Sequence, residues 1–117
     1  MNKRAVGTAW EKEAGAYLER LGFRIICYNF RSRYGEIDLI AMEGNVLVFV
    51  EVKYRSGDRR GYPEEAVDSR KRRKICQTAL YYMSRYGYSE AGGCRFDVVA
   101  FDCEKVRLLR NAFEFEG

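Results

Sequence analysis

The sequence predicts an α/β protein with one mixed β-sheet flanked by helices and with its elements in the order αβββαββ. Two kinds of pattern support this prediction. Two segments place apolar residues at helical spacing, and five short segments are rich in the branched and aromatic residues that favour strands. With 117 residues, no internal repeat and no linker, residues 1–117 are expected to form one domain around one core.

The first helix is expected to cover residues 8–21. Thr8 has the position of an N-cap, and Glu11 three residues later completes a capping box. Gly22 then ends the helix. One side of the helix is apolar and predicts burial against the sheet; it consists of Trp10, Ala14, Tyr17, Leu18 and Leu21.

Five strands and a second helix are expected after residue 22. The strands are predicted over residues 23–30, 35–41, 46–53, 95–101 and 106–109. The second helix is expected to begin near Pro63 and to end near Tyr86. Its buried side consists of Ile75, Ala79, Tyr82, Met83 and Tyr86. Continued back by one turn, that side includes Lys71 and leaves Arg72 and Arg73 toward solvent.

Gly44-Asn45 is a two-residue turn signal that predicts a hairpin between the second and third strands and sets its register. Asp38 then lies opposite Glu51, and Glu36 lies opposite Lys53. Their face also carries the pairs Ile40–Phe49 and Met42–Leu47, whereas the other face is wholly apolar and consists of Ile37, Leu39, Ala41, Val48, Val50 and Val52. A slip by one residue would separate the two acids, so this geometry depends on the turn.

Asp38, Glu51 and Lys53 are charged residues in strands that are otherwise typical of a core. A buried carboxylate without a partner is costly, and two opposed carboxylates repel each other unless a proton or a cation lies between them. One open alternative is a structural ion pair between Glu51 and Lys53. The other is a metal site in which Asp38 and Glu51 bind Mg²⁺ or Mn²⁺, because these ions prefer oxygen ligands.

A metal at this position would suit the hydrolysis of phosphodiester bonds. Metal-bound water loses its proton more easily than bulk water and becomes a nucleophile. Lys53 follows Glu51 by two residues and therefore lies on the same face of its strand. There it would orient the attacking water or stabilise the charge that grows on the phosphate.

The composition excludes several other classes of site. Histidine is absent and the four cysteines form no C-x-x-C pair, so neither a zinc site nor a histidine-based triad is expected, and the cysteines are expected to stay reduced. The longest uninterrupted apolar run is Val46–Val50, and no secretory signal is recognisable. We therefore expect no membrane segment and a cytoplasmic location.

The net charge of +4 is unevenly distributed along the chain. Basic residues gather in the loop Arg55–Arg60 and in the run Arg70–Lys74. Such clusters near an acidic site favour a phosphate-bearing partner, with Arg31, Arg55 and Lys71 as candidate contacts with nucleic acid. The alternative for the run is the solvated face of an ordinary helix.

A series of motifs runs in order along nearly the whole chain. They are Gly7-x-x-x-Glu11-x-x-Ala14, Asn29-x-Arg31, Gly35-Glu36-Ile37-Asp38-Leu39-Ile40, Phe49-Val50-Glu51-Val52-Lys53, Gly61-x-Pro63, Lys71 and Arg95-Phe96-Asp97-Val98-Val99. With these motifs the sequence resembles the YraN family of small bacterial proteins. That family is placed in the restriction-endonuclease-like PD-(D/E)XK superfamily, whose D…(D/E)-x-K core is similar to Asp38 followed by Glu51-Val52-Lys53.

The resemblance implies a restriction-endonuclease-like sandwich and a metal-dependent nuclease acting on DNA. The superfamily includes archaeal Holliday-junction resolvases, in which an acidic residue of the first helix joins the metal site; here that role falls on Glu11. The implied catalytic set is Glu11, Asp38, Glu51 and Lys53, with Glu11, Asp38 and Glu51 as ligands of Mg²⁺ (or Mn²⁺). A resolvase-like enzyme would act on branched or recombination intermediates, and would need a homodimer to cut two strands.

The alternative to an enzyme is a non-catalytic nucleic-acid-binding or adaptor module of a DNA-processing complex, working with a helicase or a recombination partner. The intact set of Glu11, Asp38, Glu51 and Lys53 favours the nuclease. The small size of the domain favours the module.

Overall fold

The computed structural model describes residues 3–55, 68–89, 93–102 and 105–115. Its elements are α1 (Lys3–Arg20), β1 (Arg24–Ser32), β2 (Gly35–Glu43), β3 (Val46–Arg55), α2 (Ser69–Arg85), β4 (Cys94–Asp102) and β5 (Lys105–Phe113). The predicted α/β class and the order αβββαββ are therefore confirmed. None of the helices in this described part is long and apolar enough to cross a membrane.

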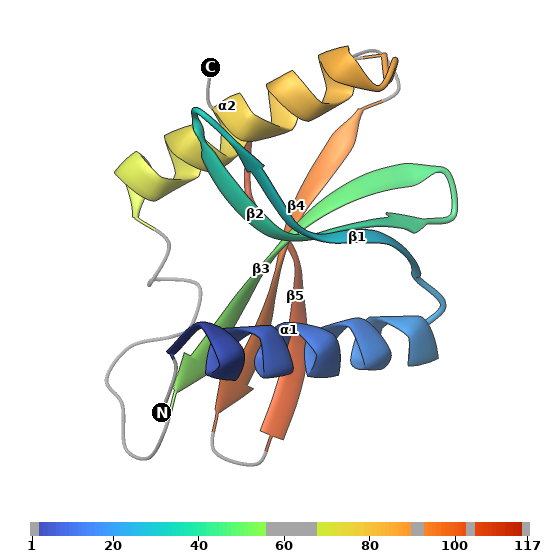
Figure 1. The fold of residues 1–117 in the computed structure, drawn as a ribbon. Coiled ribbons are helices and arrows are strands. Elements are labelled where there is room, and N and C mark those ends of the chain that lie inside the picture. The colour runs from blue at the N-terminus through green and yellow to red at the C-terminus, as the bar shows by residue number, and fades with distance from the viewer. Residues whose placement is uncertain (1–2, 56–67, 90–92, 103–104, 116–117) are drawn as a thin grey trace.

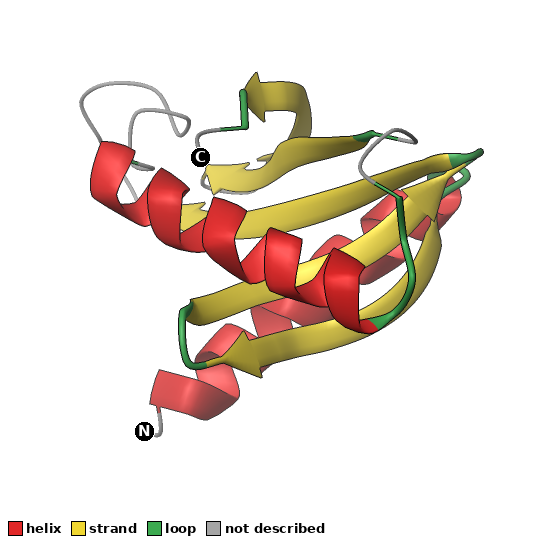
Figure 2. Ribbon diagram, turned by 90° about the horizontal axis from the view of Figure 1, so that it is seen from above, coloured by secondary structure: helices red, strands yellow, loops and turns green. Residues whose placement is uncertain are grey.

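The five strands form one mixed sheet in the order β1-β2-β3-β4-β5. The strands β1, β2 and β3 are antiparallel neighbours, β3 and β4 are parallel, and β5 returns antiparallel to β4. A parallel pair needs a crossover, and the segment that carries α2 provides it. The two helices lie on opposite faces of the sheet, as Figure 1 and Figure 2 show.

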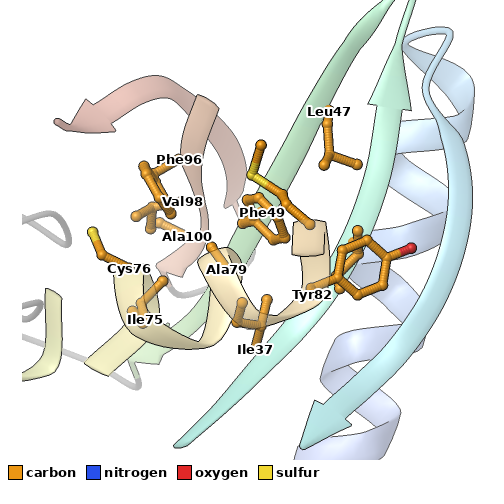
Figure 3. Packing of buried hydrophobic residues seen from close by; sticks show 12 residues of the cluster. Ile37, Leu47, Phe49, Ile75, Cys76, Ala79, Tyr82, Phe96, Val98 and Ala100 are labelled. Atoms are coloured by element: carbon orange, nitrogen blue, oxygen red, sulfur yellow. The ribbon is translucent and has the colours of Figure 1, made fainter. Parts of the chain in front are cut away.

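The core between α2 and the sheet is rich in aromatic rings. Phe49 of β3 packs edge-on against Tyr82 of α2 with ring centroids 5.9 Å apart, and it stacks on Phe96 of β4 at 5.7 Å. Figure 3 shows residues of α2 and of the strands meeting in this cluster, whose buried members are Ile37, Ile40, Leu47, Phe49, Ile75, Cys76, Ala79, Tyr82, Met83, Phe96, Val98 and Ala100. The buried side predicted for α2 is confirmed except at Tyr86.

The core between α1 and the sheet is smaller and mainly aliphatic. Its buried members are Ala14, Leu18, Phe23, Leu39, Ala41, Val48, Val50, Val99 and Phe101. Leu21 was expected here, but it is 43% exposed, and Tyr86 of the other helix is 55% exposed. Both residues follow the last residue of their helix, so the helical period no longer sets their direction.

The structure corrects the predicted starts of both helices. α1 begins at Lys3 rather than Thr8, because the helix-favouring residues Lys3, Arg4 and Ala5 extend it. Glu11 is therefore an interior residue and not part of a capping box. α2 begins after Asp68, whose extended backbone and side chain, accepting from the Lys71 N–H at 2.9 Å, form the N-cap. One helix therefore cannot run on from Pro63, which itself lies outside the described residues.

The hairpin register is confirmed over the part next to the turn. Leu39 pairs with Val50, Ile40 with Phe49 and Met42 with Leu47, and Gly44 adopts a φ of 60° in the turn. β5 is longer than predicted and continues to Phe113, past the left-handed residue Asn111, near which the pairing of β4 with β5 shifts register.

The far end of the hairpin departs from the expected pattern. The pairing of β2 with β3 ends at Leu39–Val50, short of the expected pairs Asp38–Glu51 and Glu36–Lys53. Glu36 forms an ion pair of 3.2 Å with Arg31, its partner residue on β1. Ile37 belongs to the core beneath α2, whereas Leu39 and Ala41 belong to the core beneath α1. The simple alternation of faces fails here because β2 passes a distortion at Asn29 of β1, which has a φ of 54°.

Candidate functional site

The candidate site lies where the paired part of the β2–β3 hairpin ends. The carboxylate of Asp38 on β2 accepts a hydrogen bond from the backbone N–H of Val52 on β3, at 2.8 Å to Oδ2. This bond replaces the backbone ladder beyond Leu39–Val50 and fixes the carboxylate between the positions of Glu51 and Lys53. The acid is thus held against the strand that carries the other two charged residues.

Glu51 is a buried acid in the middle of β3, with only 4% of its surface exposed. Its Oε2 lies 3.4 Å from the Nζ of Lys71, in the first turn of α2. Burial, followed by the nearby charge of Asp38, raises the pKa of Glu51 to about 8 against the opposing effect of the two lysines. At neutral pH this carboxyl therefore holds a proton unless a cation replaces it.

The two lysines of the site have pKa values shifted in opposite directions. Burial, followed by contact with Lys71, lowers the pKa of Lys53 to about 8. Burial is the largest effect on the pKa of Lys71 and acts to lower it, but Glu51, Lys53 and Asp38 together outweigh burial and the net pKa is raised. Lys71 is therefore the permanent cation of the site, while Lys53 is the lysine that can release a proton near neutral pH.

Glu11 approaches the site from α1, on the other face of the sheet. Its Oε1 accepts a hydrogen bond of 2.7 Å from the side-chain amide of Asn29 on β1. Burial and the charge of Asp38 raise the pKa of Glu11 to about 7. Asp38 thus interacts with Glu51 and with Glu11, so the structure brings together the four residues predicted as the catalytic set.

Two contributors to the site were not recognised as such in the sequence. Asn29 was part of the Asn29-x-Arg31 motif but had no assigned role. Its place in that motif was the one signal of its importance. Lys71 was predicted as a nucleic-acid contact, which stays a prediction, and the structure adds that its Nζ lies beside the Glu51 carboxyl group. The helical spacing that turned Lys71 toward the sheet was the available signal.

The other predicted nucleic-acid contacts are not part of this cluster. Arg31 forms its exposed ion pair with Glu36 near the β1–β2 turn. The side chain of Arg55 lies outside the described residues. A groove of about 340 Å³ does connect with the site through Lys71, and its described lining is Gly35, Glu36, Asp68, Arg70, Lys71, Lys74 and Ile75.

The donor set fits a hard divalent cation that retains water. Within the described residues, no group of three or more acidic or thiol side chains converges into a ready metal cage. Mg²⁺ in proteins is commonly held by one or two carboxylates together with water, and Asp38 and Glu51, whose charges interact, are the residues that could supply them. The raised pKa of the buried Glu51 marks an acid whose charge the described residues around it do not fully compensate.

A second charged cluster, at the other end of the sheet, has a structural character. Asp97 is fully buried on β4 and accepts two hydrogen bonds of 2.8 Å from the guanidinium of Arg95 and one of 2.9 Å from the backbone N–H of Asn111. Arg95 also pairs with Glu43, which Arg110 approaches at 2.7 Å. Every carboxylate here has its cation, so the cluster fastens β5 to the β2–β3 hairpin.

Asp97→Asn is expected to lower the free energy of unfolding by about 2–4 kcal/mol, because it leaves the Arg95 guanidinium facing a neutral group in a buried setting. Urea unfolding followed by circular dichroism measures this change. The control is Arg31→Gln, which breaks an exposed ion pair and should cost less than about 1 kcal/mol. Equal small effects of the two substitutions would contradict the structural assignment.

Fold and site together define an α/β protein in which a mixed sheet carries a half-buried cluster of acids and lysines between two helices. The model of the uncharacterised protein family UPF0102 matches residues 10–101, a range that contains every member of the cluster. The chain belongs to this family, which is the YraN-like family that the motifs resembled.

Relatives across this family match the chain nearly end to end. A UPF0102 protein of Lachnoclostridium phytofermentans is 47% identical over 117 residues, covering 100% of this chain and 99% of the relative. A UPF0102 protein of Symbiobacterium thermophilum is 50% identical over 115 residues, covering 94% of this chain and 97% of the relative. A UPF0102 protein of Geobacter sulfurreducens is 42% identical over 118 residues, covering 97% of this chain and 91% of the relative.

Proposed function

We propose that this protein is a metal-dependent endonuclease of the restriction-endonuclease-like superfamily, which hydrolyses phosphodiester bonds in DNA, including branched or recombination intermediates. The observation that carries the proposal is the burial of Glu51 beside Asp38, with Lys53 on the same strand. The mixed sheet with helices on both faces supports the superfamily placement.

A structural ion pair explains this cluster less well than a reaction site does. Such a pair needs one acid and one base, as the Arg95–Asp97 pair illustrates. Here the acids Glu11 and Glu51 have raised pKa values and Lys53 has a lowered one, so the charges are not mutually satisfied. Opposite shifts of acids and bases in one place are typical of catalytic groups.

Asp38 and Glu51 would hold the Mg²⁺ (or Mn²⁺), with Glu11 as a further ligand, directly or through water. When bound, the metal would lower the pKa of a water molecule and polarise the phosphate. The Val52 N–H fixes the orientation of Asp38, and the Asn29 amide does the same for Glu11. These bonds hold each of the two carboxylates in one orientation before any substrate arrives.

The lysines would act on the phosphate and on the proton. Lys71 keeps its charge and so would stabilise the negative charge that grows on the phosphate oxygens. Lys53, with a pKa of about 8, would orient the attacking water and exchange a proton with it near neutral pH. The groove beside Lys71 offers a path for the nucleic-acid backbone into the site.

The direct test is cleavage of a panel of DNA substrates in Mg²⁺ and in Mn²⁺: duplex, single strand, flap and four-way junction. Wild type is expected to cut at least one of them, and Lys53→Met to cut it roughly 10²-fold more slowly, since it removes one charge-stabilising group. Lys12→Met, an exposed lysine of α1, is the control and should cut at the wild-type rate. Equal product from all three proteins would reveal a contaminating nuclease and contradict the proposal.

One observation favours the second candidate, a non-catalytic nucleic-acid-binding or adaptor module. The described residues contain no three-acid metal cage, so the site depends on only two well-placed carboxylates. A module would bind DNA with a steep salt dependence and cut none of the panel, leaving catalysis to a helicase or recombination partner. If instead the protein cuts a four-way junction on two strands, a homodimer is the expected active form.

A further inference from the structure

The outer face of α2 carries a stripe of exposed residues that the proposed reaction does not use. Its members are three or four residues apart and so share one face of the helix; they are Arg70, Lys74, Gln77, Tyr81 and Arg85. The stripe begins at the groove of the candidate site, which Arg70 and Lys74 line. The stripe continues to Arg85 at the end of α2. Tyr81 follows Lys71 by ten residues and therefore lies about 15 Å from it along the helix axis.

The turn between β1 and β2 lies against this stripe. A Cβ atom on Gly35 would be 3.4 Å from the hydroxyl of Thr78 and 3.5 Å from the Cβ of Lys74, which shows how closely the turn meets α2. In the same turn, Tyr34 has its ring centroid 6.0 Å from that of Tyr81. The turn and the helix therefore form one continuous surface.

Three tyrosines form the aromatic part of this surface, and we call Tyr34, Tyr81 and Tyr86 the tyrosine surface. Phe30 of β1 supports it from below, with ring centroids 6.1 Å from Tyr81 and 6.5 Å from Tyr86. Tyr81 is 38% exposed and Tyr86 is 55% exposed. Contiguous exposed rings, unlike exposed apolar residues scattered singly, are typical of a binding surface.

Arginines accompany these rings. The Arg33 guanidinium lies 5.0 Å from the ring centroid of Tyr34 and donates a hydrogen bond of 2.9 Å to its hydroxyl. The Arg85 guanidinium lies 5.7 Å from the centroid of Tyr86. Aromatic rings that alternate with cations are the composition of surfaces that bind single-stranded nucleic acid, where bases stack on the rings and phosphates meet the cations.

We infer that the tyrosine surface binds unpaired nucleotides next to the bond that is cut, so that the preferred substrate contains a single-stranded segment. This inference rests on the proposed nuclease function for its placement beside the site, but the binding itself needs no catalysis. Phosphates along Arg70, Lys71 and Lys74 would bring the adjoining bases to Tyr34 and Tyr81. Bases in an intact duplex are already stacked on one another and would make no use of the rings.

Binding of fluorescently labelled oligonucleotides in EDTA tests the inference without any cleavage. The probes are a thymidine 15-mer, a uridine 15-mer and a blunt 15-base-pair DNA duplex. Wild type is expected to bind the single strands more tightly than the duplex, and Tyr81→Leu to weaken single-strand binding roughly 5- to 10-fold through loss of base stacking. Tyr81→Phe keeps the ring and should bind as wild type does.

The matched control is Tyr28→Leu. Tyr28 is also exposed, at 36%, and also lies near a cation, Lys12, but it belongs to the α1 side of the sheet. Its replacement should leave affinity unchanged, and a thermal melt shows that each variant is folded. Tighter binding of the uridine 15-mer than of the thymidine 15-mer would identify RNA as the nucleic acid that supplies the unpaired segment.

Equal affinity of wild type for single strand and duplex, or equal affinity of Tyr81→Leu and wild type for the single strand, would overturn the inference. Neither result depends on cleavage, because EDTA removes the metal. The nuclease proposal can therefore fail while the binding surface stands, and the binding surface can fail while cleavage of duplex DNA is observed.

Discussion

Glu51→Gln is expected to slow cleavage by roughly 10²–10³-fold or more. The same substitution is expected to make the metal-free protein more stable at pH 8. The substitution keeps the shape of the side chain but removes a buried charge. Replacing a side chain that stabilises the fold lowers the free energy of unfolding. Replacing a side chain that is buried for its reactivity raises the free energy of unfolding, because the cost of burying its charge is removed.

The pH dependence of this effect follows from the raised pKa of Glu51, about 8 in the folded protein against an ordinary value of 4.5. Between these values the folded state holds a proton that the unfolded state lacks, so wild-type stability is fully present below pH 4.5 and declines as pH rises to about 8. Glu51→Gln lacks this decline and should exceed wild type by about 1–3 kcal/mol at pH 8. Near pH 5 the two proteins should be alike.

Urea unfolding at pH 5, 6.5 and 8 in EDTA measures the difference. Glu13→Gln, an exposed acid on α1, is the matched control and should show the wild-type slope. A Glu51→Gln protein that is less stable than wild type at pH 8 would mean that the pair with Lys71 is a structural asset, and would remove the main support for a reaction site.

Mg²⁺ is expected to raise the melting temperature of the wild type strongly and in a pH-dependent way. A ligand at 100 times its dissociation constant stabilises the folded state by about 2.7 kcal/mol, which for a chain of this size corresponds to roughly 10 °C. The ion must displace protons from Glu51 and Glu11, whose pKa values are about 8 and about 7. Stabilisation should therefore grow as pH rises from 6 to 8.5, because metal binding competes with protons.

Thermal melts with and without Mg²⁺ at pH 6, 7 and 8.5 check this expectation. The variant Asp38→Asn/Glu51→Gln should show no shift at any pH, and Arg31→Gln, outside the cluster, should behave as wild type. An equal shift in wild type and in the double variant would place the ion elsewhere on the protein.

The sequence predicted best the features that short-range chemistry determines. Gly44-Asn45 fixes the hairpin locally, and the period of two then puts Asp38 and Glu51 on facing strands without further information. The helical spacing around Ile75 likewise placed most of the α2 core correctly. These elements needed no knowledge of distant contacts.

Features that depend on contacts far apart in sequence were not predictable in the same way. Asn29 is left-handed in a strand and donates to Glu11, which lies 18 residues earlier on a helix across the sheet face. The face of Ile37 changes because β1 distorts beside β2, a tertiary effect that overrides alternation. Asp68 could have been recognised as an N-cap, but the earlier Pro63 gave a competing start signal.

The arrangement of the acids around Asp38 has a consequence for when the site comes into existence. The hairpin that holds Asp38 and Glu51 is a local structure and can form before the rest of the chain. Lys71 and Glu11 arrive only with α2 and α1, which cover opposite faces of the sheet. A partly folded chain therefore presents an incomplete set of groups, and the proposed reaction would need molecules that have assembled both layers.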